Sequence, residues 1–150
     1  SFGHDIESSW LIEKAINVLS EDYPAAERYR AQVERLAEVA LVEGLLSAGG
    51  MADEYDLATG DLTPSAWWVQ AEAMVGFASR WAYGGGKHYL DAALFVWRHV
   101  QRNYLDQQHG EWLWHSRQDV APEASEYKIG PWKAPYHNGR AMLLMHHLLS

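Results

Sequence analysis

Two histidines far apart in the chain stand in stretches whose chemistry suits acid–base catalysis. His4 and Glu7 lie three residues apart in GHDIE, so on a helix the imidazole and the carboxylate share one face. A carboxylate beside an imidazole fixes its tautomer and raises its pKa, which suits a general acid or base. An ordinary helix N-terminus offers an alternative interpretation, because acidic side chains there complement the helix dipole.

The second histidine, His137, lies in PWKAPYHNGR between Trp132 and Arg140. The same two interpretations stand here: an imidazole available for proton transfer, or a structural histidine satisfied by hydrogen bonds. Glu72 lies between them in sequence, inside the nearly continuous apolar stretch that begins WWVQAE. A buried carboxylate needs a partner, so we expect Glu72 to pair with Arg140 or Lys133, or to accept a hydrogen bond from a substrate hydroxyl.

The aromatic composition indicates a carbohydrate as a candidate ligand. The chain has 8 Trp and 8 Tyr against 3 Phe, and flat rings with a polar group suit open clefts in which sugars stack. Filling of gaps between helices is the alternative for many of these rings. Trp112 and Trp114, two apart in GEWLWHS, would share one face of an extended segment. For this pair the sequence favours packing within a loop over contact with a ligand.

Composition excludes several classes of protein. The 150 residues carry a net charge of −8, which disfavours nucleic-acid binding, and contain no Cys for thiol chemistry, disulfides or zinc knuckles. Apolar runs are too short for a membrane span, and a cationic leader is lacking, so we expect a cytoplasmic protein. The chain opens without Met on a dense motif, and we therefore expect residues 1–150 to be one part of a longer protein.

The positioning elements are predicted to be helices, because apolar residues recur at three- and four-residue steps. Tyr23-Pro24, Gly49-Gly50 and the glycines at 84–86 separate them. Ser65 is a plausible N-cap for the third helix. We expect a small hairpin near Tyr55 and a short strand at 110–116. The predicted helices cover residues 5–19, 25–48, 66–83, 87–104 and 136–149.

Helical pairs joined by longer loops predict either a solenoid or a closed toroid. In an array of antiparallel hairpins, the first, third and fifth helices point the same way. Their N-terminal ends, which carry the three polar stretches, would then share one opening.

Together, the stretches GHDIE, WWVQAEAMVGF, GEWLW and GPWKAPYHNGR resemble the N-acylglucosamine 2-epimerase superfamily, most closely its cellobiose 2-epimerase branch. They occur in the family's order and span the chain. The resemblance implies an all-α fold, with residues 1–150 forming the C-terminal portion, about five helices, of an (α/α)6 barrel. It further implies inversion at C2 of a reducing-end sugar without a metal or another cofactor.

By the same resemblance, His4 and His137 correspond to the family's acid–base pair, and Glu7 to the glutamate of its GHDIE motif. We expect Glu7 to orient His4. His137 would remove the C2 proton, His4 would return a proton to the opposite face of the enediolate, and the direction of reaction can exchange these roles.

The resemblance also assigns substrate-binding positions. Trp132 matches a sugar-stacking tryptophan, Trp67 and Trp68 match the family's tryptophan pair, and Glu72 matches the glutamate of WWxQAE. Which tryptophan of the pair stacks on the sugar stays open. The family also uses an Arg and another His from its N-terminal half, so the site is expected to be incomplete within these 150 residues.

Several functions therefore remain in view. An aldose–ketose isomerase of the mannose type shares the enediolate but returns the proton to C1. A glycoside hydrolase would need two carboxylates, for which Glu7 and Glu72 are candidates. A glycan-binding module would need the tryptophans alone. The expected partners are a mono- or disaccharide, and either the remaining part of the barrel or a second copy covering an apolar flank.

Overall fold

The computed structural model describes residues 1–19, 23–63, 65–118 and 127–150. Within them the chain is all-α, as predicted, and residue pairs bridge as isolated β-partners without forming a strand. No helix in the described ranges is long and apolar enough to cross a membrane. The helices are α1 (Phe2–Leu19), α2 (Ala26–Val39) with the π-helical turn η1 (Ala40–Gly44), α3 (Trp67–Ala82), α4 (Lys87–Asn103) and α5 (Tyr136–Leu149).

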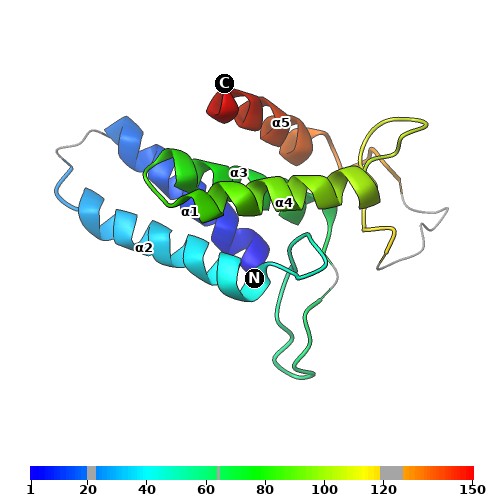
Figure 1. Cartoon of the computed structure of the whole chain (residues 1–150), viewed down its shortest axis with the longest axis horizontal. Helices are drawn as coiled ribbons and strands as arrows, with labels where there is room; N and C mark the ends of the chain where they lie inside the picture. The colour runs from blue at the N-terminus through cyan, green and yellow to red at the C-terminus, as the bar shows by residue number, and fades with distance from the viewer. Residues whose placement is uncertain (20–22, 64, 119–126) are drawn as a thin grey trace.

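Helix α3 forms the centre of the fold. It packs against α1, α4 and α5, whereas α2 packs mainly against α1 (Figure 1). Every residue from Val69 to Ser79 is buried, which explains why this helix is apolar on all sides. Gly76 allows α1 to approach closely, because a Cβ there would lie 2.4 Å from Ile6 Cγ1.

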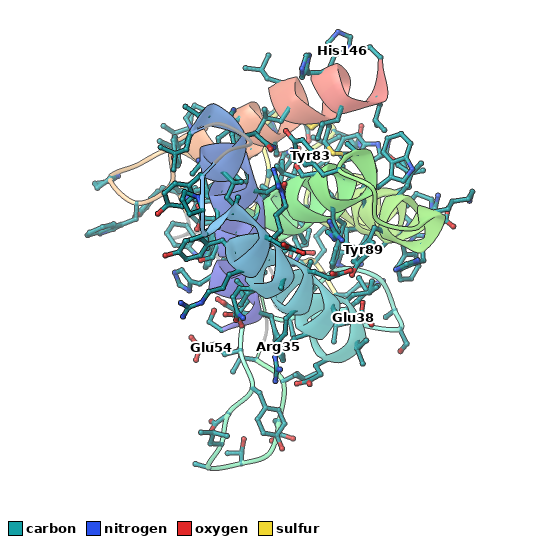
Figure 2. All side chains as sticks on the ribbon, turned by 90° about the vertical axis from the view of Figure 1, so that its left-hand side faces the viewer. Arg35, Glu38, Glu54, Tyr83, Tyr89 and His146 are labelled. Carbon is teal, nitrogen blue, oxygen red and sulfur yellow. The ribbon has the colours of Figure 1, made fainter. Side chains whose placement is uncertain are left out.

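A polar contact joins helix α2 to α4. The Tyr89 hydroxyl of α4 donates a 2.8 Å hydrogen bond to Glu38 of α2 (both labelled in Figure 2). Burial, together with the hydrogen bond to this carboxylate, raises the pKa of Tyr89 to about 12. The phenol therefore remains a hydrogen-bond donor throughout the neutral range.

The second helix is shorter than the sequence predicted. Residues 45–48, which we expected to be helical, form a turn in which extended Leu45 bridges Met51. The Gln70 side chain explains the change, because it accepts from Met51 N–H and donates to Met51 C=O. A buried amide of α3 thus fixes Met51, the residue that pairs with Leu45 across this turn.

Two other expectations are also corrected. Helix α1 begins at Phe2, whose N–H bonds to Asp53 C=O, and not at residue 5. Ser65 does not cap α3: its hydroxyl donates to Ala66 C=O, and the Trp67 N–H instead donates to Trp114 C=O. Pro64, the other residue of the predicted helix start, lies outside the described residues.

The two predicted β elements are reduced to isolated bridges. Tyr55 and Leu62 pair antiparallel around a turn, which confirms the small hairpin without regular strands. The segment 110–116 is not a strand, since its two bridges run to different partners: Trp112 to Leu105 and His115 to Ala66. Its two tryptophans consequently diverge: Trp112 is buried beside Trp97, whereas Trp114 is half-buried.

Candidate active site

A cavity of about 440 Å³ opens where the N-terminal ends of α1, α3 and α5 meet. The three polar stretches therefore share one opening, as predicted from helix direction. The cavity wall is strongly aromatic, and the two histidines of interest both reach it. It is lined by His4, Glu7, Ala66, Trp67, Trp68, Trp114, Trp132 and His137.

Both imidazoles lie close to Trp68. The Trp68 ring centroid is 4.9 Å from that of His4 and 5.7 Å from that of His137. His4 is exposed and His137 half-buried, so water or a ligand can reach both rings. Gly3 permits this arrangement, because a Cβ at that position would lie 2.7 Å from Cη2 of Trp68.

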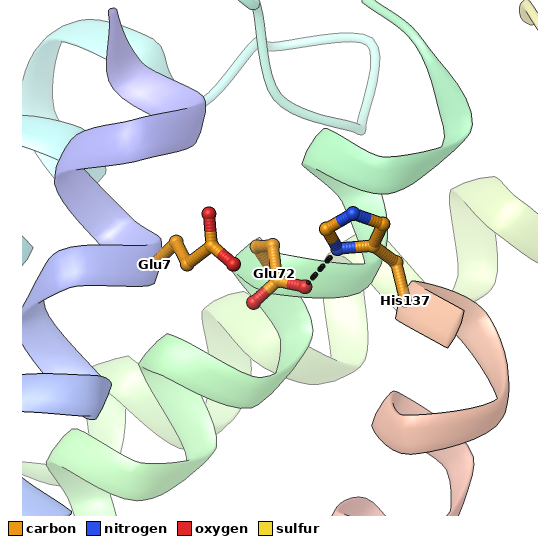
Figure 3. Close-up of side chains that lie close together, drawn as sticks. All are labelled: Glu7, Glu72 and His137. Atoms are coloured by element: carbon orange, nitrogen blue, oxygen red, sulfur yellow. Dashed lines mark hydrogen bonds and ion pairs between the residues drawn. The ribbon is translucent and has the colours of Figure 1, made fainter. Parts of the chain in front are cut away.

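A hydrogen bond to the buried Glu72 holds the His137 ring. Its Nδ1 lies 2.6 Å from Glu72 Oε1, and Figure 3 shows the other ring nitrogen pointing away from the carboxylate. The same Oε1 accepts from Arg140 Nη2 at 2.6 Å, and Oε2 accepts from Trp10 Nε1 at 2.9 Å. Glu72 is 1% exposed, so its charge is compensated entirely by these donors.

This network sets the protonation of its members. Burial by itself raises the pKa of Glu72, but hydrogen bonds from His137, Arg140 and Trp10 outweigh it and the pKa lies below its ordinary value. For Arg140, burial opposes the charged form, yet hydrogen bonds to Glu72 and Glu7 raise its pKa. An ionised Glu72 favours the His137 tautomer with its proton on Nδ1, which leaves a lone pair on Nε2.

Of the partners considered for Glu72, the structure selects Arg140. Lys133 is buried elsewhere, with its Nζ 3.1 Å from Glu111 Oε1 and 4.9 Å from the Trp67 ring centroid. Both Glu72 oxygens accept hydrogen bonds from protein donors and the residue does not line the cavity, so its binding of substrate stays a prediction. Its contacts give it a positioning role for His137.

Glu7 also departs from its expected partner. Glu7 Oε1 accepts from Arg140 Nη2 at 3.2 Å, while His4 Nδ1 contacts Ser1 Oγ at 3.1 Å. The predicted orientation of His4 by Glu7 is therefore wrong in this geometry, although both line the cavity. The guanidinium joins α5 to both α1 and α3, because it bonds one carboxylate on each.

A metal ion is disfavoured at this cluster on charge grounds. Glu7, Glu72 and His137 bring ligand atoms within 4.8 Å of one another, which is close enough to hold an ion. Arg140, however, already bonds both carboxylates. A cation would have to displace the guanidinium to obtain its ligands.

The tryptophans take different positions around the cavity. Trp132 is 82% exposed at the rim, whereas Trp67 is 3% exposed and packs edge-on against Trp114 at 4.7 Å. Trp68, close to both imidazoles, is the half-buried member of the pair. The sequence favoured loop packing for Trp114, but this residue lines the cavity. Its C=O bond to the first turn of α3 is a tertiary contact without a local sequence signal.

The packed helices, with an aromatic and histidine-lined cavity at the N-terminal ends of α1, α3 and α5, define an all-α protein with an open site of ligand size. The N-acylglucosamine 2-epimerase family model matches residues 2–141, and the chain belongs to this family. Over 141 residues it is 42% identical to the cellobiose 2-epimerase of Bacteroides fragilis, an alignment that covers 93% of this chain and 36% of that protein.

Solved structures agree on the fold. A sugar epimerase from a ruminal bacterium superposes with a TM-score of 0.86 at 31% identity, and the match covers 99% of this chain and 37% of that one. A D-mannose isomerase superposes at 0.78 with 19% identity, which supports the fold alone. The five helices thus correspond to about 37% of an (α/α)6 barrel, so the chain spans little more than a third of its relatives.

Proposed function

We propose that this chain provides the acid–base half of the active site of a cofactor-independent sugar 2-epimerase. The observation that carries the proposal is the placement of His4 and His137 in the wall of one open cavity, each with its ring close to that of Trp68. Inversion at a carbon requires proton removal from one face and delivery to the other. Two imidazoles in the wall of one cavity can supply both groups, because an imidazole can either accept or donate a proton.

The proposed reaction begins with the open-chain aldehyde of a reducing-end aldose. His137 Nε2 takes the C2 proton, and the electron pair of the broken C–H bond moves into the C1–C2 bond to give an enediolate. His4, as imidazolium, then delivers a proton to the opposite face of C2, which regenerates the C1 carbonyl in the epimer. Each imidazole would contribute about 10²–10⁴-fold to the rate.

Glu72 supports this role by holding His137. Its bond to Nδ1 directs the basic Nε2 away from the carboxylate and stabilises the imidazolium that forms after proton removal. Trp68 lies close to both imidazoles, so a sugar held against its ring would bring C2 near both. Trp132 at the rim would stack on a second sugar ring.

The substrate we propose is a β-linked glucose disaccharide of the cellobiose type. Relatives named cellobiose 2-epimerase align with nearly the whole chain, and the cavity of about 440 Å³ is within the range of sites for ligands of this size. The donors that stabilise the enediolate oxygens would come in part from the remaining portion of the barrel. That portion is the protein partner we propose for the exposed flanks of α1 and α5.

A glycoside hydrolase fits the geometry less well. Such an enzyme needs two carboxylates facing the scissile bond, whereas Glu72 is buried beneath the cavity wall and paired with Arg140. Glu7 alone faces the cavity.

The test is incubation of the full-length protein with cellobiose, and separately with mannose, in D₂O, followed by NMR. A glucosyl-mannose product carrying deuterium at C2 supports the proposal. A ketose product would instead assign a mannose-type isomerase, free glucose a hydrolase, and binding without exchange a glycan-binding module.

Replacement of His137 by alanine provides the internal control. His137→Ala should abolish exchange and leave sugar binding largely intact, because the tryptophan surfaces remain. Exchange retained in this variant removes His137 from the mechanism.

A further inference from the structure

Glu111, in the loop between α4 and α5, holds the segment that carries both Trp132 and His137. Its Oε1 accepts hydrogen bonds from Lys133 Nζ at 3.1 Å and from Asn138 Nδ2 at 2.7 Å. Lys133 follows Trp132 in the chain, and Asn138 follows His137. The same carboxylate oxygen thus bonds the sequence neighbour of the rim tryptophan Trp132 and the sequence neighbour of the proposed base His137.

Both donors are buried, which makes these contacts specific. Lys133 is 0% exposed, and its ammonium has Lys128 C=O at 3.1 Å as a second acceptor. Burial lowers the pKa of Lys133 despite the opposing effect of Glu111. Glu111 is therefore the counter-charge of a buried cation. Asn138 is also buried, so its amide donates to Glu111 without competition from bulk water.

The backbone of Glu111 is itself unusual. It has a φ of +67°, and among the described residues it is the only non-glycine residue with a positive φ. This left-handed conformation favours glycine, and a glutamate persists there only when surrounding contacts hold it. The contacts are present on both sides: Glu111 C=O accepts from Asp106 N–H, and the next residue, Trp112, is buried in the core.

A second ion pair fixes the same segment from the other end of this turn. Lys128 Nζ bonds to Asp106, so Asp106 and Glu111 each receive one lysine from residues 128–133. The turn between them is closed by the Gly110 N–H bond to Asp106 C=O. The segment therefore docks on a preformed turn, and its position follows from two charge pairs.

We propose that Glu111 is a positioning residue that sets Trp132 through Lys133 and His137 through Asn138. The inference rests on the proposed epimerase function and extends it to a residue remote from the reacting carbon. Each of the two donors, Lys133 and Asn138, is expected to affect a different kinetic parameter. Loss of the Lys133 contact displaces the stacking surface, which acts on substrate binding, whereas loss of the Asn138 contact displaces the base, which acts on the chemical step.

The experiment measures kcat and KM for cellobiose epimerisation by the full-length protein and four variants. Lys133→Met should raise KM by about fivefold or more with kcat little changed, and Asn138→Ala should lower kcat by about tenfold or more with KM little changed. Glu111→Gln keeps a carbonyl acceptor for the neutral Asn138 amide but removes the counter-charge of buried Lys133, so it should raise KM as Lys133→Met does, with kcat little changed. The exposed pair Lys87–Asp91 supplies the control, Lys87→Met, with no expected change.

A general loss of structure would lower kcat and raise KM together in the Glu111, Lys133 and Asn138 variants, in step with a fall in melting temperature, and this result overturns the proposal. Binding of cellobiose, followed by tryptophan fluorescence, separates it from failure of the proposed function. If the parent protein binds cellobiose without exchange, the epimerase function fails. Weakened binding in Lys133→Met then still supports the Trp132 contact, and unchanged binding refutes it. A parent protein that neither binds nor exchanges overturns both.

Discussion

Glu72 and His137, 65 positions apart in sequence, are joined by a 2.6 Å hydrogen bond between Oε1 and Nδ1. The carboxylate is buried beneath the cavity, whereas the imidazole lines it. The relationship resembles that of the acidic and basic members of a hydrolytic triad, in which a buried carboxylate sets the tautomer of the working imidazole. Here the same arrangement serves proton transfer at carbon in the proposed reaction.

Glu72→Gln should lower kcat by about 10²–10⁴-fold with a much smaller effect on KM, because the amide cannot enforce the Nδ1–H tautomer or stabilise the imidazolium. Exchange at C2 in D₂O measures the loss. Glu27→Gln, a like substitution on the exposed face of α2, should leave the rate unchanged. Equal rates for Glu72→Gln and the parent protein would mean that Glu72 does not act through His137.

The lowered pKa of Glu72 predicts a pH dependence of stability. A carboxyl group whose folded pKa is depressed adds stability above its unfolded value of 4.5, and this contribution disappears as pH falls through the folded pKa. The difference in unfolding free energy between the parent protein and Glu72→Gln should therefore be constant near neutral pH and shrink below about pH 4.5. Denaturant titrations at a series of pH values measure it, and a difference that grows in acid contradicts the assignment.

Arg140→Met should destabilise the protein by about 2–4 kcal/mol, because it leaves the buried Glu72 and the neighbouring Glu7 without their shared cation. Lys87→Met removes an ion pair whose side chains are 77% and 56% exposed, and it should cost less than about 1 kcal/mol. Chemical denaturation of both variants provides the comparison. Similar losses in the two would show that burial of the Arg140 network contributes nothing extra.

Gly3→Ala should displace Trp68 and weaken sugar binding, since the new Cβ would lie 2.7 Å from the indole. Gly139, inside α5, is the matched control: its nearest neighbour to a new Cβ is Pro135 at 3.9 Å. Gly139→Ala should stabilise the protein by about 0.5–1 kcal/mol through helix propensity. Isothermal titration with cellobiose and thermal unfolding distinguish the two variants, and equal affinity in Gly3→Ala would contradict the role given to Trp68.

Trp112 and Trp114 should respond oppositely to alanine. Trp112→Ala removes a core side chain and should cost about 3–5 kcal/mol in stability. Trp114→Ala removes part of the cavity wall and should mainly reduce affinity for the sugar. The pair of measurements, unfolding free energy and sugar affinity, would contradict the structure if the two effects were exchanged.

The sequence by itself determined the helices and the gathering of their polar ends. The spacing of apolar residues predicted all five helices. Repeats of three and four residues give a helix one apolar face, and that face is buried whichever element packs against it. The direction of alternate helices then placed His4, Trp68 and His137 at one opening. The four motifs predicted the family, and the family match confirmed it.

Only the tertiary structure decided which polar groups pair. Spacing suggested Glu7 as the partner of His4, but Arg140, more than a hundred residues away in sequence, takes that carboxylate together with Glu72. Likewise, Gln70 bonds to Met51 in the turn that follows the second helix, and Trp114 packs against Trp67 and not beside Trp112. In each case the deciding hydrogen bond or ring contact joins residues that local sequence cannot place together, because its energy depends on burial that exists only after the helices have packed.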